Sequence, residues 1–339
     1  MRLRPNPDTH PDTDPDAAAA AVPPPGVETQ VGPALDPGGA AGGGGLVSPW
    51  GAVASRLRQL GWSDDLLDSH AYDWRQSPPA WSRPGGSFQQ LRAQIEARSA
   101  AARGPCTRVV LLGLSLGGTY AAAFLGSGLV DEEWKARHVE RLVSISGVWG
   151  GTPASPWDVI SGRLEGLEAV LDRAAVRALV RGLPSLAWTF PAPRLFGGAG
   201  APPPVINAAT GRAYGAEQLG QALRDAGAAD AAAFWEAALP YSFISAPNVS
   251  THCFYSYGLP SVLSITYGTY DFSDAHPAVQ YGDGDVTVPY ASLAACRTWA
   301  TVQSAPVRSY SYYGVVHAQL TGVAEALQDI VDAVAGLAG

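Results

Sequence analysis

The chain has 339 residues, of which 47% are hydrophobic and 15% charged, and it carries a formal net charge of −8. That length and composition allow a large buried core, so we expect a globular enzyme-sized domain. This negative net charge argues against binding to nucleic acid, whose phosphates require basic patches, and against a general attraction for anionic membranes. No apolar run approaches the roughly 18 residues of a membrane-spanning helix.

The first 45 residues are rich in Pro, Ala, Asp and Gly and end in a glycine run at positions 42–45. Such a segment buries too little apolar surface to offset its conformational entropy, so we expect most of it to be disordered. Its opening residues, 1–7, contain two arginines but lead into no hydrophobic segment, so we do not expect them to act as a signal peptide. Ordered structure is expected from Leu46, in one catalytic domain over residues 46–339.

Periodicity predicts the elements of that domain. Helices are expected at 50–62 and 87–102, and a short strand-like stretch is expected to end at Tyr72–Arg75, a corner with a packed Asp73–Arg75 pair. Further strands are expected at 108–112, 139–145 and 310–316, and an amphipathic helix at 320–334.

Residues 152–250 do not alternate between strand and helix. They contain helical patterns near 166–180 and 216–228 and a Pro/Gly-rich stretch at 191–204, and we interpret them as an inserted cap. Its aromatic residues are expected to form the core of the cap, and several together to line a pocket. These residues are Trp157, Trp188, Phe190, Phe196 and Trp235.

The most informative motif is Gly113-Leu114-Ser115-Leu116-Gly117, which lies between an apolar strand pattern and a helix pattern of small residues. In that setting G-x-S-x-G is typical of the nucleophile elbow of α/β-hydrolases, with Ser115 as the nucleophile. The glycines are expected to flank a strained turn where a Cβ would collide. An ordinary turn is the alternative reading of this motif.

A serine nucleophile needs a histidine base and a carboxylate that orients it, and in this fold the order is Ser, acid, His. His317 follows the last predicted strand and precedes the last helix, where the base belongs. Asp285 of the Gly282-Asp283-Gly284-Asp285 turn is the expected acid, with Asp283 as the alternative. A calcium loop or a solvated turn is the competing interpretation, although no glutamate follows at the position that an EF-hand requires.

Several blocks resemble, in order, those of the lecithin:cholesterol acyltransferase family, which includes lysosomal phospholipase/transacylases. The similarity covers roughly residues 23–338. It lies in the segments PGVETQV at 25–31, YDWR at 72–75, SISGVWGG at 144–151, YGLP at 257–260 and YGDGDVTV at 281–288, and it ends on His317. Leu114 replaces the usual histidine of the family elbow, and Gly147-Val148 replaces the usual Ala-Pro.

The resemblance implies an α/β-hydrolase fold with an inserted cap and a Ser115–Asp285–His317 triad. It implies no metal or organic cofactor. The Leu116 backbone N–H would be one oxyanion donor, while the second is unassigned, because the N-terminal oxyanion and lid segment of the family is not recognisable here. Cys253 and Cys296 match cysteines that form a disulfide in the family, although sequence spacing alone equally allows two buried thiols.

Asn248-Val249-Ser250 is a possible glycosylation site close to Cys253. Together with the expected disulfide, it favours a secretory lumen, a lysosome or vacuole, or the extracellular space. The resemblance implies an O-acyltransferase that moves a fatty acyl group from a phospholipid to a sterol, a diacylglycerol or water, with contact to a membrane or lipoprotein surface. The alternatives are a phospholipase or carboxylesterase without transferase activity, and a catalytically inactive lipid-binding protein.

Overall fold

The computed structural model describes residues 3–5, 27–29, 49–101, 107–163, 172–198 and 200–337. The expected disorder of residues 1–45 lies outside the described residues, apart from two short antiparallel strands, β1 (Leu3–Pro5) and β2 (Val27–Thr29). Cys106 also lies outside them.

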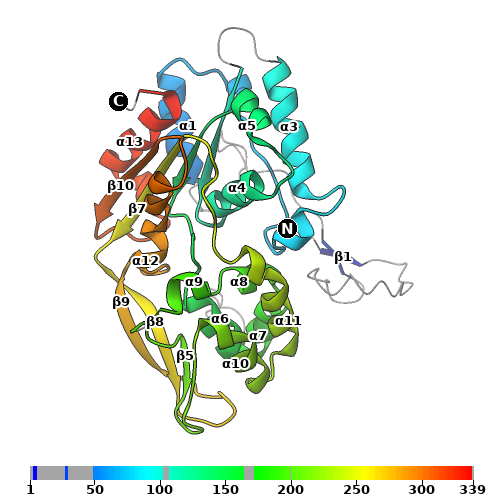
Figure 1. The fold of residues 1–339 in the computed structure, drawn as a ribbon, viewed down its shortest axis with the longest axis vertical. Coiled ribbons are helices and arrows are strands. Elements are labelled where there is room, and N and C mark those ends of the chain that lie inside the picture. Colours follow the sequence, from blue (N-terminus) through cyan, green and yellow to red (C-terminus); the bar gives the residue numbers. More distant parts are fainter. Residues whose placement is uncertain are drawn as a thin grey trace.

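A parallel sheet of four strands forms the upper half of the molecule in Figure 1, with the order β10-β7-β4-β3. The strands are β3 (Val109–Leu114), β4 (Val139–Ile145), β7 (Thr251–Tyr257) and β10 (Val307–Tyr313). Strands buried on both faces are expected in such a sheet, because helices cover each side. The predicted strands at 108–112, 139–145 and 310–316 are therefore confirmed within a few residues.

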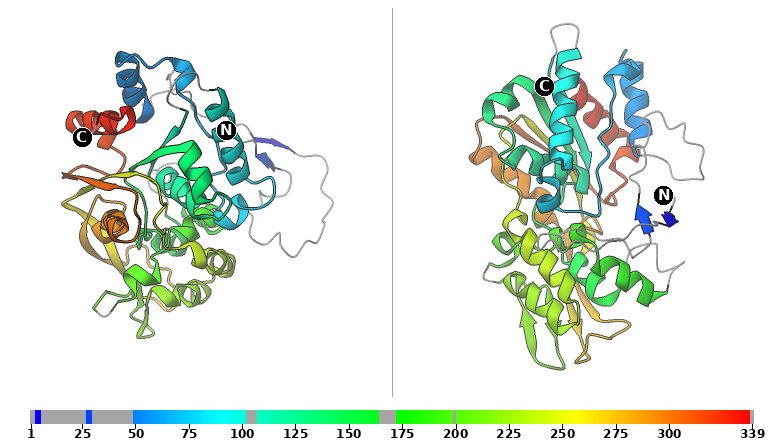
Figure 2. Two further views of the ribbon diagram at one scale, coloured as in Figure 1. Left: turned by 45° about the horizontal axis from the view of Figure 1, so that its top comes forward. Right: turned by 90° about the vertical axis from the view of Figure 1, so that its right-hand side faces the viewer.

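Helices cover the two faces of this sheet, as the turned views in Figure 2 show. One face packs on α1 (Pro49–Gln59) and α13 (Ala324–Ala335), and the other on α3 (Ser87–Ala101), α4 (Leu116–Gly126) and α5 (Glu132–His138). Side chains alternate between these cores along each strand: Leu142 of β4 enters the core beneath α4, whereas Val143 enters the core beneath α13.

The lower half in Figure 1 has a separate core, built from helices and a second sheet with the order β6-β5-β8-β9. Its helices are α6 (Ala154–Ser161), α7 (Arg173–Arg181), α8 (Pro184–Trp188), α9 (Pro193–Phe196), α10 (Leu219–Asp225) and α11 (Ala229–Ala238). Its strands are β5 (Val205–Asn207), β6 (Arg212–Tyr214), β8 (Leu259–Tyr267) and β9 (Ala278–Gly284). We call this half the cap layer; the fold is an α/β-hydrolase fold with an inserted cap.

Sequence periodicity missed three features of this architecture. β5, β6 and the long β8–β9 hairpin were not expected, and the hairpin brings residues beyond position 250 into the cap layer. The strand expected before Tyr72 is wrong, because residues 67–73 form an irregular loop before the turn at 74–75. The expected Asp73–Arg75 pair is confirmed, with a contact of 2.7 Å between Arg75 Nη2 and Asp73 Oδ2.

The aromatic residues of the predicted cap do not all share one environment. Phe190 and Trp235 enter the core of the cap layer, as expected. Trp188 instead belongs to the core beneath α4, where it lies edge-on to Trp81 at 5.2 Å. Among the described residues, none of the helices has both the length and the hydrophobicity needed to cross a bilayer.

Candidate active site

Ser115 lies at the turn between β3 and α4 with a backbone conformation that is strained for a residue with a side chain. Its φ is 52° and its ψ is −123°, outside the regions that non-glycine residues ordinarily occupy. The Ser115 N–H donates to the Ile145 carbonyl at 2.7 Å, which ties the turn to the end of β4. Strain of this kind persists only where the surroundings hold it, as in a nucleophile elbow.

Two glycines beside Ser115 are required by close packing. A Cβ at Gly113 would lie 2.5 Å from the backbone nitrogen of Gly118, and a Cβ at Gly118 would collide with the Ser144 hydroxyl. A Cβ at Gly117 would meet only the Tyr72 hydroxyl, at 4.0 Å. The steric expectation therefore holds for the first glycine of the motif but is wrong for Gly117, since the second close approach occurs one residue later.

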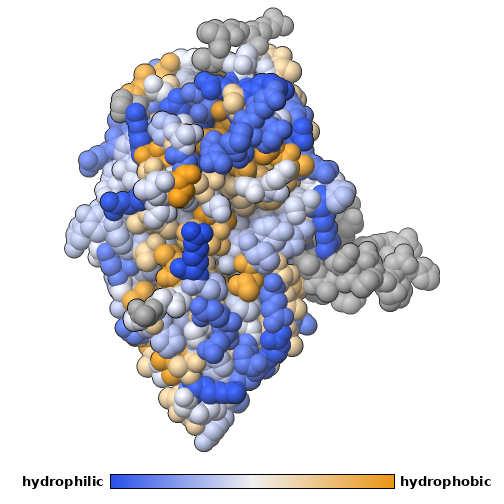
Figure 3. Space-filling model, viewed as in Figure 1, coloured by the Kyte–Doolittle hydropathy of each residue, from blue (hydrophilic) through white to orange (hydrophobic). Residues whose placement is uncertain are grey.

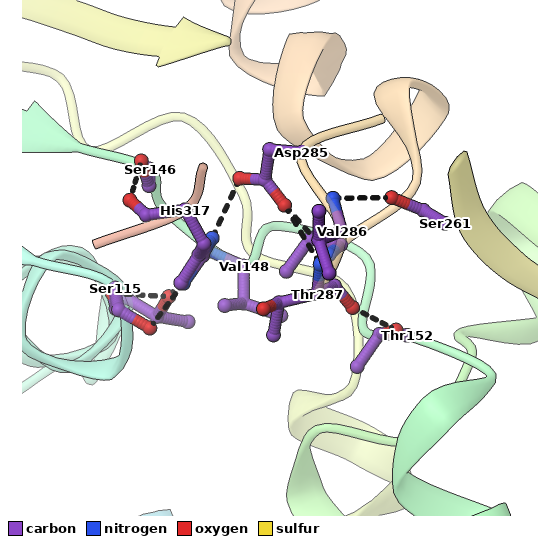
Figure 4. Close-up of polar contacts among 11 residues, drawn as sticks. Ser115, Ser146, Val148, Thr152, Ser261, Asp285, Val286, Thr287 and His317 are labelled. Carbon is purple, nitrogen blue, oxygen red and sulfur yellow. Dashed lines mark hydrogen bonds and ion pairs between the residues drawn. The ribbon is translucent and has the colours of Figure 1, made fainter. Parts of the chain in front are cut away.

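His317 lies between Ser115 and Asp285 and contacts both side chains, as Figure 4 shows. His317 Nε2 lies 2.8 Å from Ser115 Oγ, and His317 Nδ1 lies 2.6 Å from Asp285 Oδ2. An ionised carboxylate can only accept hydrogen bonds, so the Nδ1 proton faces Asp285 and Nε2 is left to accept the serine proton. The structure thus brings the three predicted residues together with the spacing of a catalytic triad.

The Asp285 carboxylate is completely buried, yet it is well supplied with hydrogen bonds. Its Oδ1 accepts the N–H groups of Thr287 at 3.2 Å and Val288 at 2.8 Å, while Oδ2 faces the imidazole. The His317 N–H also donates to the Asp285 carbonyl at 3.0 Å. These bonds compensate for the loss of water around a buried charge and fix the orientation of the carboxylate.

The loop that carries His317 is fixed by a hydroxyl that sequence reasoning did not identify. Ser146 follows β4, has a φ of 51°, and donates from Oγ to the His317 carbonyl at 2.9 Å. Serine in a loop carries no spacing signal of its own, so its role could not be read from the sequence. Ser146 is completely buried, and it links the end of β4 to the imidazole loop.

The alternative acid and the other described histidines lie in different environments. Asp283 accepts the Gly258 N–H at 2.6 Å and so fixes the start of the β8–β9 hairpin. His252 is buried in β7 and stacks on Tyr310, while His276 is exposed in a loop. Within the residues that the structure describes, His, Cys, Asp and Glu side chains form no group of three suited to a metal ion.

Leu116 is the first residue of α4, so its N–H has no acceptor within the helix. The helix N-terminus also favours negative charge, which makes this N–H suitable for an oxyanion that develops beside Ser115.

Cys253 of β7 and Cys296 of the 3₁₀ segment Ala294–Thr301 are both buried free thiols in the structure, so the expected disulfide is not formed in it. Both belong to the core beneath α4, and burial together with the neighbouring Cys296 raises the pKa of Cys253. Asn248 is exposed and donates from its amide to Glu132 at 3.2 Å.

Comparison with known proteins places this architecture in a family. A family model for lecithin:cholesterol acyltransferase matches residues 24–210. The chain is 29% identical to the lysosomal phospholipase A and acyltransferase of Bos taurus over 253 residues, which covers 73% of the chain and 57% of the relative. It is 28% identical to the lecithin-cholesterol acyltransferase-like 1 protein of Arabidopsis thaliana, with 69% and 54% covered.

The chain therefore spans only between half and two thirds of these relatives' length. Among solved structures, the Tle4–Tli4 complex resembles it with a TM-score of 0.50 at 17% identity, covering 78% of this chain and 67% of that one, a likeness of fold alone. The family match extends over more than half of the chain and includes the Ser115 elbow. The chain belongs to the lecithin:cholesterol acyltransferase family.

Proposed function

We propose that the chain is a serine O-acyltransferase that moves a fatty acyl group from a phospholipid, through an acyl-serine intermediate, to an alcohol or to water. The observation that carries this proposal is the hydrogen-bonded row from Ser115 through His317 to Asp285, with distances of 2.8 and 2.6 Å, in a chain of this family. Such a row activates a hydroxyl that is otherwise a weak nucleophile.

In the first half of the reaction, His317 Nε2 takes the Ser115 proton as Oγ attacks the ester carbonyl. The Leu116 N–H donates to the oxyanion, and Asp285 stabilises the imidazolium. His317 then returns the proton to the departing lysophospholipid oxygen, which leaves an acyl-serine. In the second half, the same nitrogen takes the proton of the alcohol or water as its oxygen attacks the acyl carbon. The bond to Ser115 Oγ then breaks, His317 returns the proton to Oγ, and the new ester or free fatty acid is released.

We infer that the cap layer lies over the acyl-binding side of this site. The Thr152 hydroxyl donates to the Thr287 carbonyl at 2.7 Å, so the chain enters the cap layer beside the acid. Val286 and Val316 adjoin Asp285 and His317 and are 38% and 36% exposed. The face drawn in Figure 3 intersperses hydrophobic with hydrophilic residues. Apolar side chains beside the triad suit a lipid substrate presented at a surface.

A fluorophosphonate probe tests the activated serine, because only a nucleophile with a working base reacts. Wild-type protein should be labelled at Ser115 and Ser115→Ala should not be. The transfer step is then tested with phosphatidylcholine vesicles, in which a rising concentration of a long-chain alcohol should divert product from free fatty acid to the new ester. Labelling without diversion would favour a phospholipase, and no labelling would favour an inactive lipid-binding protein.

A further inference from the structure

The turn that carries Asp285 contains a residue in an unfavourable backbone conformation. Val286 has a φ of 84°. A β-branched side chain disfavours positive φ strongly, and glycine would adopt it without penalty. The conformation therefore persists only because neighbouring groups hold it. The Asp285 carboxylate depends on this turn, since its Oδ1 accepts the N–H groups of Thr287 and Val288, the two residues that follow Val286.

Two buried hydroxyls of the cap layer hold the turn from outside, as Figure 4 shows. Ser261 of β8 accepts the Val286 N–H at 2.9 Å, and its side chain is completely buried. Thr152, in the segment before α6, donates from Oγ1 to the Thr287 carbonyl at 2.7 Å. The two bonds hold the peptide group before Val286 and the one after Thr287.

The bond from Thr152 acts on the same peptide group that binds the acid. The carbonyl of this peptide belongs to Thr287 and accepts from Thr152, while its N–H belongs to Val288 and donates to Asp285 Oδ1 at 2.8 Å. Hydrogen bonds in such a chain polarise and strengthen one another. The hydroxyl of Thr152 is thus connected through one peptide group to the carboxylate that orients His317.

We propose that Ser261 and Thr152 are positioning residues for the reaction, which act by keeping the Val286 turn left-handed and the Asp285 carboxylate aligned with His317. The inference rests on the proposed function and adds that the cap layer supports the acid as well as covering the site. Neither hydroxyl lies on the elbow or on the loop of His317, so their effect passes through Asp285.

The first test compares Ser261→Ala with Ser264→Ala. Ser264 lies on the same strand, is buried, and donates to the Pro203 carbonyl at 2.5 Å, so it controls for the loss of a buried hydroxyl away from the acid. A small displacement of a catalytic group lowers turnover by roughly 10- to 100-fold. We expect a loss of that size in kcat for Ser261→Ala, with KM unchanged, and wild-type kcat for Ser264→Ala.

The second test is rescue by removing the strain. In Ser261→Ala/Val286→Gly, glycine adopts the positive φ without the help of Ser261, so kcat should return to within a few-fold of wild type. For Thr152, a change to Val removes the hydroxyl and should lower kcat, whereas a change to Ser retains it and should not. Circular dichroism and Tm verify that each variant is folded.

The outcomes separate the two proposals. If wild-type protein fails to react with a fluorophosphonate, the proposed function fails. If wild type reacts but Ser261→Ala turns over as fast as Ser264→Ala, or if the glycine double variant folds and recovers no activity, the positioning role is overturned. The role is supported by a selective loss of kcat at Ser261 and Thr152 together with recovery of kcat when Val286→Gly is added to Ser261→Ala.

Discussion

Ser146 Oγ donates to the His317 carbonyl at 2.9 Å, so the end of β4 and the loop after β10 are joined directly although β7 lies between these strands in the sheet. The same end of β4 accepts the N–H of Ser115 through Ile145. The nucleophile and the base are therefore positioned from adjacent residues of one strand end.

Asp285→Asn is expected to lower kcat by about 10⁴-fold, because the amide no longer fixes the imidazole tautomer. Asp283→Asn is the matched control, since it also removes one charge from the same turn but retains an oxygen that can accept the Gly258 N–H. Turnover of a soluble ester by both variants measures the difference. A larger loss at Asp283 would reassign the acid.

The two glycines after the nucleophile should respond differently to alanine. Gly118→Ala places a methyl group against Ser144 in a closely packed interface between α4 and β4, and overpacking of this kind typically destabilises by about 1–3 kcal/mol. In Gly117→Ala the new methyl group meets only the Tyr72 hydroxyl, at 4.0 Å, and alanine is favoured over glycine within a helix by about 1 kcal/mol. Urea denaturation should show a lower free energy of unfolding for the first variant and an equal or higher one for the second.

Some residues of the candidate active site could be predicted from the sequence, and others could not. Ser115 and His317 could be predicted because each lies at a strand–helix junction marked by local hydrophobic patterns. Asp285 was predicted from its acidic turn, with Asp283 as the alternative, but the place of that turn in the fold was not, since β9 pairs antiparallel with β8 in the second sheet and not with the strand of His317. Ser146 and Ser261 were not predictable, because their roles depend on contacts between segments far apart in the chain. For Thr152, the only pattern in the sequence that marks its surroundings is the tryptophan–glycine–glycine turn that it follows.

The Cys253–Cys296 pair should be slow to react in reduced, folded protein. Burial and the neighbouring Cys296 raise the pKa of Cys253, and the thiolate is the reactive form. Iodoacetamide followed by peptide mapping should find both cysteines unmodified until the protein is unfolded. We also expect them to be joined in protein made in an oxidising compartment, with a gain in stability of about 4 kcal/mol for a loop of this length. Free thiols in that preparation would contradict the predicted disulfide.

His252 should make the fold sensitive to acid. Burial, assisted by the positive charges of Arg141 and Arg308, lowers the pKa of His252 from 6.5 to about 4. Between these values the unfolded chain binds a proton that the native state excludes, so stability decreases as the pH falls through this window. The Tm of His252→Gln should therefore fall less than the Tm of wild type when the pH is lowered from 7 to 4.5. His276→Gln, at an exposed site, serves as the control and should follow wild type.

The acyl chain of the substrate should determine the efficiency of the reaction. Each methylene group that the site buries contributes about 0.8 kcal/mol, but this energy raises kcat/KM only where the chain is still bound in the transition state. The exposed Val286 and Val316 beside the triad supply apolar surface for such a chain. We therefore expect kcat/KM to rise from butyryl to palmitoyl esters presented in the same mixed micelles. A preference for butyryl esters at equal surface concentration would contradict the long-chain assignment and favour a simple carboxylesterase.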